Sequence, residues 1–163
     1  MIELRELTED DKDQLIVHLN NQDVVRFLSS RIPTPYTEKD ALWWINEGSK
    51  AEIVRAITFY DDFVGIIGVR RDILEKSHRG EIGYWLGQPF WGKGIATSAI
   101  EIMCQYIFNK TDIVQLYAPV FSSNEGSKKV LIKNGFKLEG TITKGIFKNG
   151  VYYDECIYCK NCS

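Results

Sequence analysis

The sequence of 163 residues lacks the features that mark several specialised classes of protein. No apolar run approaches the roughly 20 residues of a membrane-spanning helix, so no membrane partner is expected. The net charge is only −2, which gives no general electrostatic attraction for nucleic acid. Residues 1–7 alternate apolar and charged side chains, unlike a signal peptide, so the expected compartment is the cytoplasm.

The sequence has four cysteines: Cys104, Cys156, Cys159 and Cys162. The last three form Cys-x-x-Cys-x-x-Cys, a spacing that invites a zinc interpretation. Residues 151–158 are typical of a strand, however, in which successive side chains point to opposite faces. If the strand runs through Cys159, this side chain and that of Cys156 cannot share one tetrahedral ion. We therefore expect reduced thiols and no metal.

What is present is the composition of an ordinary globular protein, 44% hydrophobic and 26% charged. The length predicts a single domain over residues 1–163. Strands are expected at 2–7, 53–60, 63–70, 81–86, 113–120, 136–147 and 151–159. Helices are expected after an N-cap at Thr8 and at 23–28, 37–45, 93–108 and 124–133. Asp61-Asp62 and Asn149-Gly150 are expected as hairpin turns. Because strands come in runs, the pattern favours a mixed α+β sheet.

The most informative segment is the turn of residues 88–97, which separates an expected strand from an expected helix. Gly92, Gly94 and Ala96 carry little or no side chain to keep a ligand from the backbone. The first N–H groups of the following helix lack intrahelical acceptors and lie at the positive end of its dipole. Such a turn suits phosphate oxygens. The spacing matches neither a P-loop, since Lys93 lies between the glycines, nor a dinucleotide fingerprint, since Ser98 stands where a third glycine is needed.

The Trp-Gly-Lys-Gly-Ile-Ala-Thr stretch instead resembles the pyrophosphate loop of the Gcn5-related N-acetyltransferases (GNAT). The resemblance spans residues 2–158 and is closest to the RimJ/RimL-like branch. It also rests on the Gly-Tyr-Trp-Leu strand, on Asn-Glu-Gly-Ser at 124–127, on Asn-Gly-Phe at 134–136 and on the terminal Asn-Gly-x-Tyr-x-Asp. It implies an α+β fold (an α/β three-layer sandwich) whose mixed, mostly antiparallel seven-stranded sheet is flanked by about four helices and splayed between strands 4 and 5.

The implied activity is direct transfer of the acetyl group of acetyl-CoA to a primary amine in a ternary complex. The acceptor is a protein N-terminus or a small amine, and a homodimer is left open. The backbone at the glycine turn would hold the pyrophosphate, the end of the fourth strand the pantetheine and thioester, and an asparagine the pantetheine arm. The cofactor-binding residues are then Trp85, Leu86, Gly92, Lys93, Gly94, Ile95, Ala96, Thr97 and Asn124.

Two residues match catalytic roles in the family. Ser127 is placed like the hydroxyl that protonates or hydrogen-bonds the coenzyme A sulfur, and Glu81 like the carboxylate base. The alternatives are that Asn124 and Ser127 only begin a helix and that Glu81 is a surface residue. Asp154 and Glu155 are other candidate bases. His18 and His78 lie far from these motifs in the sequence, and His78 falls in a polar loop.

The acceptor pocket of this fold would be shaped by Phe27, Tyr36, Trp43 and Trp44, for which core packing is the alternative. The chain departs from the branch at Ser98, where relatives often carry glutamate. This departure motivates a second hypothesis, a catalytically weak or inactive acetyl-CoA-binding module. Proximity of two bound reagents favours the enzyme.

Overall fold

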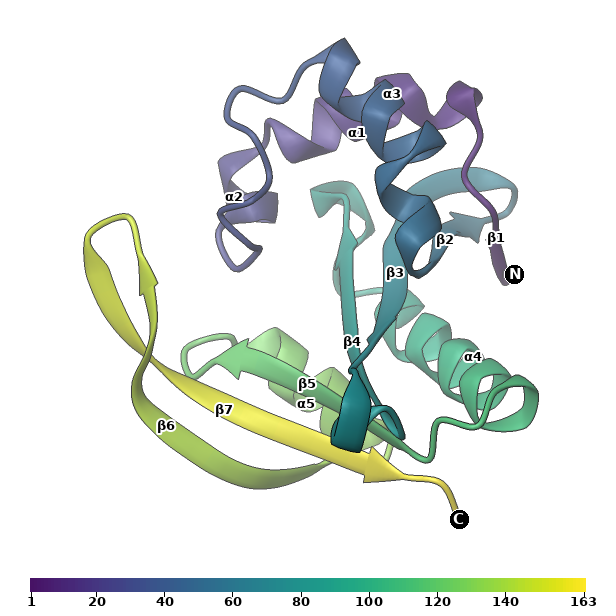
Figure 1. The fold of residues 1–163 in the computed structure, drawn as a ribbon. Helices are drawn as coiled ribbons and strands as arrows, with labels where there is room; N and C mark the ends of the chain where they lie inside the picture. The colour runs from purple at the N-terminus through teal and green to yellow at the C-terminus, as the bar shows by residue number, and fades with distance from the viewer. The chain divides into compact units, whose positions relative to one another are not determined.

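The computed structural model describes all 163 residues, and its strands form one seven-stranded sheet in the order β1-β2-β3-β4-β5-β7-β6 (Figure 1). The strands are β1 (Ile2–Arg5), β2 (Ile53–Phe59), β3 (Asp62–Arg71), β4 (Arg79–Leu86), β5 (Gln115–Phe121), β6 (Lys137–Lys148) and β7 (Val151–Asn161). The α-helices are α1 (Lys12–Leu19), α2 (Gln22–Val25), α3 (Glu38–Asn46), α4 (Ile95–Lys110) and α5 (Glu125–Lys133). Short 3-10 segments are η1 (Glu9–Asp11), η2 (Gly48–Ala51), η3 (Leu74–Lys76) and η4 (Gln88–Phe90).

The predicted mixed sheet is confirmed. β4 and β5 run parallel, with Arg79 to Glu81 opposite Gln115 to Tyr117, and the strand order is consistent with the predicted splay between them. The pairs β1–β2, β2–β3, β5–β7 and β6–β7 are antiparallel. Five α-helices form, as the pattern along the chain predicts, where the resemblance implied about four.

The chain divides into two compact units, which are described separately. One comprises Met1–Val69 and Gly83–Ala99, the other Arg70–Ile82 and Ile100–Ser163. In the first unit, β1, β2 and β3 are antiparallel neighbours, and α1 and α3 contribute side chains to the same core. Its core contains the side chains of Leu7, Leu15, Leu19, Tyr36, Ala41, Ile45, Val54, Ala56, Phe63 and Ile66.

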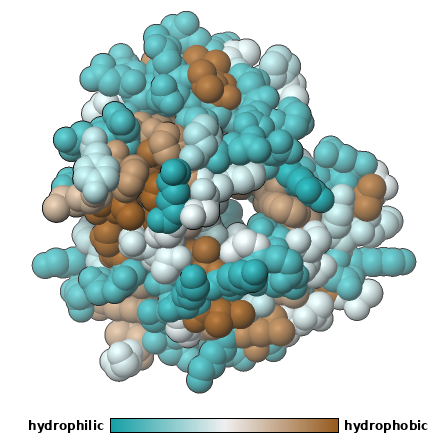
Figure 2. Space-filling view, turned by 180° about the vertical axis from the view of Figure 1, so that it is seen from behind, coloured by the Kyte–Doolittle hydropathy of each residue, from teal (hydrophilic) through white to brown (hydrophobic).

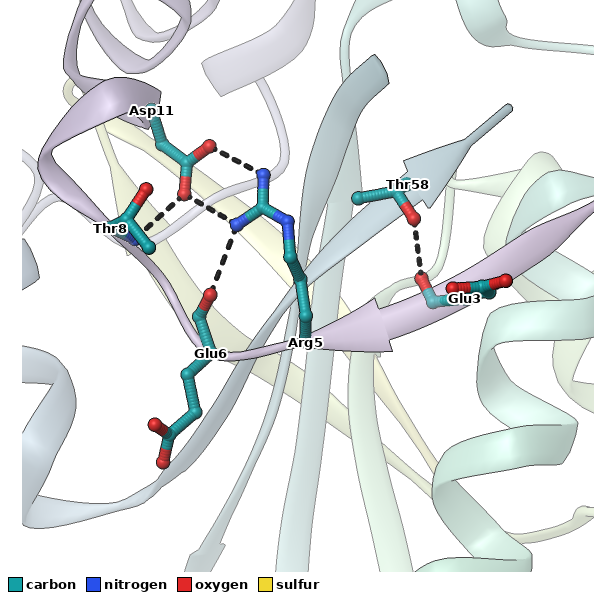
Figure 3. A network of polar contacts seen from close by, with 6 residues as sticks. All are labelled: Glu3, Arg5, Glu6, Thr8, Asp11 and Thr58. Carbon is teal, nitrogen blue, oxygen red and sulfur yellow. Dashed lines mark hydrogen bonds and ion pairs between the residues drawn. The ribbon is translucent and has the colours of Figure 1, made fainter. Parts of the chain in front are cut away.

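An ion pair joins β1 to the start of α1 (Figure 3). The Arg5 guanidinium donates two hydrogen bonds, of 2.9 and 2.7 Å, to the carboxylate of the buried Asp11. Asp11 also accepts the Thr8 N–H at 2.9 Å. The predicted N-cap at Thr8 is therefore real, but it opens η1, and α1 follows from Lys12.

Three local predictions in this unit agree with the structure to different degrees. The capping box of α3 is confirmed, since the Thr37 N–H reaches the Asp40 carboxylate at 2.9 Å and the Asp40 N–H reaches Thr37 Oγ1 at 3.3 Å. The helix expected over 23–28 is wrong in extent, because α2 ends at Val25. The hairpin turn lies one residue earlier than expected: Tyr60 and Asp61 have positive φ angles of 50° and 70°, the conformation of a type I′ turn.

In the second unit, β7 lies between β5 and β6. Helix α5 ends as expected at Asn134-Gly135. Gly135 has a φ of 84°, its N–H bonds Ile132 O at 3.0 Å, and the Phe136 N–H bonds Leu131 O at 3.1 Å, the pattern of a Schellman cap. The Asn149-Gly150 turn is confirmed by positive φ angles at both residues.

Strand β7 runs through Cys159 to Asn161, as predicted. Cys156 lies opposite Val120 and Cys159 opposite Tyr117, so the two cysteine side chains point to opposite faces of the sheet. Both are buried, and all four cysteines are free thiols.

The surface seen in Figure 2 is largely hydrophilic, with separate apolar patches. Exposed large apolar residues include Leu138, Ile142, Phe147, Val151 and Tyr152 on the β6–β7 hairpin. No helix is long and apolar enough to cross a membrane.

Candidate active site

The glycine turn connects η4 to helix α4, and its backbone explains its glycines. Gly92 and Gly94 have φ angles of 72° and 77°, which other residues adopt only with strain. A Cβ added at either position would meet nothing within 4 Å, so the space beside the turn is open. The Ser98 N–H, bonded to Gly94 O at 3.2 Å, begins the intrahelical ladder. The amides of residues 95–97 therefore precede that ladder, where an anion would bind.

The end of β4 lies immediately before this turn. Leu86 is buried, and Trp85 is half-buried, packing against the core of the first unit with its ring 6.1 Å from that of Phe63. Trp91 Nε1 donates to Leu86 O at 2.9 Å and so ties the turn back to the strand end. That bond occupies the Leu86 carbonyl, and the Gly87 N–H is bonded to Val64 O at 2.8 Å.

The four predicted acceptor-pocket residues also lie in the first unit, in different environments. Tyr36 belongs to the core, its backbone bonded at both ends to the Asn20 side chain at 2.9 Å, and burial raises the pKa of its hydroxyl to about 12. Trp44 packs against the core, whereas Trp43 is 55% exposed. The Arg26 guanidinium lies 5.0 Å from the Phe27 ring. Packing thus accounts for Tyr36 and Trp44, and an acceptor role for all four stays a prediction.

Asn124 and Ser127 lie at the start of α5 in the second unit and contact each other. Asn124 Oδ1 accepts the Ser127 N–H at 3.2 Å, so Asn124 is the N-cap that the alternative interpretation foresaw. Asn124 Nδ2 also donates to Ser127 Oγ at 3.1 Å. The Ser127 hydroxyl oxygen is the acceptor in that bond.

Glu81 is one of several charged groups in the second unit. Its Oε1 pairs with the Arg70 guanidinium at 3.1 Å. Burial, and next the charge of Glu81, raise the pKa of Glu155 on β7. The other candidate, Asp154, is exposed and accepts the Lys144 N–H at 3.0 Å within the β6–β7 hairpin.

Tyr117 on β5 is held by contacts with two charged residues, Asp72 and Arg79. Its hydroxyl donates to the Asp72 carboxylate, with oxygen distances of 2.8 and 3.0 Å, and the Arg79 guanidinium lies 4.3 Å from its ring centre. Burial, and next the bond to Asp72, raise the pKa of Tyr117 to about 12. A neutral Tyr117 fixes the start of β5 opposite Glu81.

No group of three or more His, Cys, Asp or Glu side chains is placed to hold a metal ion.

The predicted residues are therefore grouped within each unit. The first holds the glycine turn, the end of β4 and the aromatic residues; the second holds Glu81, Asn124 and Ser127.

The matching protein-family model is the acetyltransferase (GNAT) domain, over residues 2–137. The chain belongs to the GNAT acetyltransferase family.

Individual relatives agree with this assignment. The uncharacterized N-acetyltransferase YoaA of Bacillus subtilis is 28% identical, over 95% of this chain and 90% of its own length. The ribosomal-protein-serine acetyltransferase of Escherichia coli is 29% identical, over 61% of this chain and 55% of its own length. The structure of the RimL ribosomal alpha-N-protein acetyltransferase in complex with coenzyme A has a TM-score of 0.87 at 20% identity, covering 99% of this chain and 94% of that one. The predicted fold and the N-acetyltransferase class are thereby confirmed.

One residue of this GNAT domain has no sequence motif to mark it. His18 of α1 is buried, and its ring lies against Gly87, the residue that follows β4. The rings of Trp85 and Phe90 have centroids 6.2 Å from that of His18. Nothing local indicates this contact, because His18 lies many residues from the glycine turn. Only its place beside Leu19 on the inward face of α1 hints at burial.

Proposed function

We propose that the protein transfers the acetyl group of acetyl-CoA directly to a primary amine, both bound at once to one N-acetyltransferase domain of residues 1–163. The observation that carries this proposal is the start of α4. Two glycines with positive φ leave open space there, and no acidic residue lies in its first turn. A pyrophosphate supplies the negative charge that such a helix end lacks.

Cofactor binding is assigned to the backbone around this helix start and to the end of β4. The amides of Gly92 through Thr97 would receive the pyrophosphate oxygens. The backbone at Trp85 and Leu86 would receive the pantetheine and the thioester carbonyl, and Asn124 the pantetheine arm. Lys93, which is exposed, would add only a screened charge.

The neutral amine nitrogen attacks the thioester carbonyl carbon, a carbon–nitrogen bond forms, the carbon–sulfur bond breaks, and the sulfur leaves with the electron pair as thiolate. The nitrogen then gives up one proton to become an amide, and the sulfur gains one to become a thiol. We assign Ser127 as the donor that protonates or hydrogen-bonds this sulfur. Its oxygen already accepts from Asn124 Nδ2, a bond that orients the hydroxyl hydrogen away from Asn124.

The ammonium form of the acceptor must lose a proton before attack. Glu81 is assigned as the base, with Glu155 as the second carboxylate of the pair. Arg70 compensates the charge of Glu81, whereas burial and Glu81 itself raise the pKa of Glu155. A raised pKa favours proton acceptance near neutral pH, which keeps Glu155 as the alternative base.

The acceptor class is a primary amine, either a protein N-terminus or a small amine. The match to the E. coli ribosomal-protein-serine acetyltransferase supports the first of these. The acceptor pocket is assigned to four aromatic residues: the exposed Trp43, the half-buried Phe27 and Trp44, and the buried Tyr36.

The test is a screen of amine acceptors, including peptides with free N-termini, in which the thiol released from acetyl-CoA is measured. Turnover that depends on the amine and is lost in Gly94→Asp supports the proposal. Tight cofactor binding without turnover on any amine would instead identify a binding module, the alternative that Ser98 motivates. Wild-type protein that does not bind coenzyme A would reject both.

A further inference from the structure

The segment that leads into the glycine turn is enclosed from two sides within the first unit. On one side is β3: the Gly87 N–H donates to Val64 O at 2.8 Å. A Cβ added at Gly65 would collide with the Trp85 carbonyl oxygen and lie 3.0 Å from Leu86 Cα. β3 thus approaches the end of β4 as closely as a glycine permits.

On the other side is the imidazole of His18. A Cβ added at Gly87 would lie 2.6 Å from His18 Nδ1 and 2.8 Å from Nε2, closer than carbon and nitrogen can approach. Gly87 has a φ of −58° and a ψ of 143°, which an alanine adopts without strain. A glycine is therefore required at position 87 by the nearby histidine ring and not by the backbone conformation.

The end of α1 and the start of α2 hold the next residue of the same segment. Asn21 Nδ2 donates to Gln88 Oε1 at 2.8 Å, and Gln88 Nε2 lies 3.5 Å from an Asp23 carboxylate oxygen. The Asn21 N–H bonds His18 O at 3.1 Å, so this corner is continuous with the histidine. Residues 87 and 88 are thus fixed by contacts from a distant part of the chain.

We propose that His18 is a positioning residue of the acetyl-transfer site. Its imidazole contacts Gly87 and so fixes where the glycine turn begins; this contact is called the seat of Gly87. The inference rests on the proposed function, because it assumes that residues 92–97 bind the cofactor. The short η4 (Gln88–Phe90) leads from Gly87 to those residues, and Trp91 ties them back to Leu86. A displacement at Gly87 would therefore move the amides that receive the pyrophosphate.

The chemistry of the histidine supports a role beyond filling space. Its Nε2 is buried without a hydrogen-bond partner, a cost that an apolar residue at this position would not incur. Burial lowers the pKa of the imidazole, which favours the neutral ring. A flat, rigid ring against a glycine sets a separation that a flexible aliphatic side chain would not define.

The test is a double-mutant cycle on coenzyme A affinity, measured by calorimetry. Gly87→Ala should weaken binding about tenfold, since the added methyl group collides with the ring. His18→Ala should also weaken binding about tenfold, by removing the seat. In the combined variant the methyl group has room, so Gly87→Ala should cost less than about threefold in the His18→Ala background. Equal losses in both backgrounds would overturn the proposal.

Two further variants separate positioning from stability. His18→Phe keeps a neutral ring and should retain affinity within about threefold, whereas loss equal to that of His18→Ala would contradict a ring seat. Val54→Ala, in the core of the first unit on β2, should lower the melting temperature without changing affinity. If His18→Ala does not fold at the assay temperature, His18→Gln serves as the second background, since its flexible side chain can withdraw from the methyl group.

The outcome also separates this inference from the proposed function. Loss of binding in Gly94→Asp with no coupling between residues 18 and 87 would reject the seat alone. Unchanged binding in Gly94→Asp would reject the cofactor site on which the seat depends.

Discussion

Helix α4 begins unlike α3 and α5, and the contrast identifies which helix end is left for a ligand. α3 begins with a reciprocal capping box between Thr37 and Asp40, and α5 with the side chain of Asn124. Both carry acids in their first turns. α4 is preceded by two glycines of positive φ and carries no acid in its first turn.

The three helices differ in what satisfies the N–H groups and the positive charge at their N-termini. A helix N-terminus needs hydrogen-bond acceptors and favours negative charge. α3 and α5 obtain both from their own residues, which stabilises them without a ligand. The start of α4 gives up this local stabilisation, and its glycines add conformational entropy to the unfolded chain. An external anion would restore what the sequence omits.

The largest expected effect comes from giving α4 the carboxylate that the other helices have. Gly94→Asp should weaken coenzyme A binding about 100-fold, because the new side chain occupies the anion site with like charge and a φ of 77° strains it. Calorimetry measures the affinity.

The matched control is Gly150→Asp in the β6–β7 turn. Gly150 has a φ of 78° and open space where a Cβ would lie, so the backbone strain is the same. Stability should fall to a similar extent in both variants, by about 1–2 kcal/mol, with affinity changed only at position 94. Equal affinities in the two variants would remove the distinction between the helix starts.

A smaller effect is expected at the start of α5, where capping and catalysis are assigned to adjoining residues. Ser127→Ala should lower kcat about tenfold and change the acetyl-CoA KM much less, because a bond to sulfur strengthens as thiolate forms. Steady-state kinetics with a saturating amine provides the measurement. Normal turnover would reduce Ser127 to the partner of Asn124 and make α5 an ordinary capped helix.

Sequence predicts helix ends and hairpin turns well because the relevant interactions are local. Thr37 and Asp40, Asn134 and Gly135, and Asn149 and Gly150 are each near neighbours whose residue types determine the backbone. The β2–β3 turn is displaced from its predicted place because Asp61-Asp62 is the more turn-like pair, whereas pairing of Phe59 with Asp62 shifts the turn onto Tyr60. The contact of His18 with Gly87 is invisible in the sequence because it depends on how α1 packs on β4, which no local pattern encodes.

Removing the cap of α3 tests whether its start serves only stability. Asp40→Ala breaks the bonds to the Thr37 N–H and hydroxyl and should cost about 1 kcal/mol of unfolding free energy, measured by urea denaturation. Coenzyme A affinity should not change. A coupled loss of affinity would show that the α3 start also shapes the cofactor site, and the contrast with α4 would then need revision.

The smallest effect should come from Lys93, the one basic side chain within the glycine turn. It is exposed, so its charge acts on a bound phosphate through water and is screened by salt. Lys93→Ala should therefore weaken coenzyme A binding about twofold at low ionic strength and leave it unchanged at about 0.5 M salt, where the Debye length is only a few ångströms. The backbone amides of the same turn do not depend on that side chain. A tenfold loss that persists in high salt would mean that Lys93 binds phosphate directly, and that the open start of α4 is completed by a side chain after all.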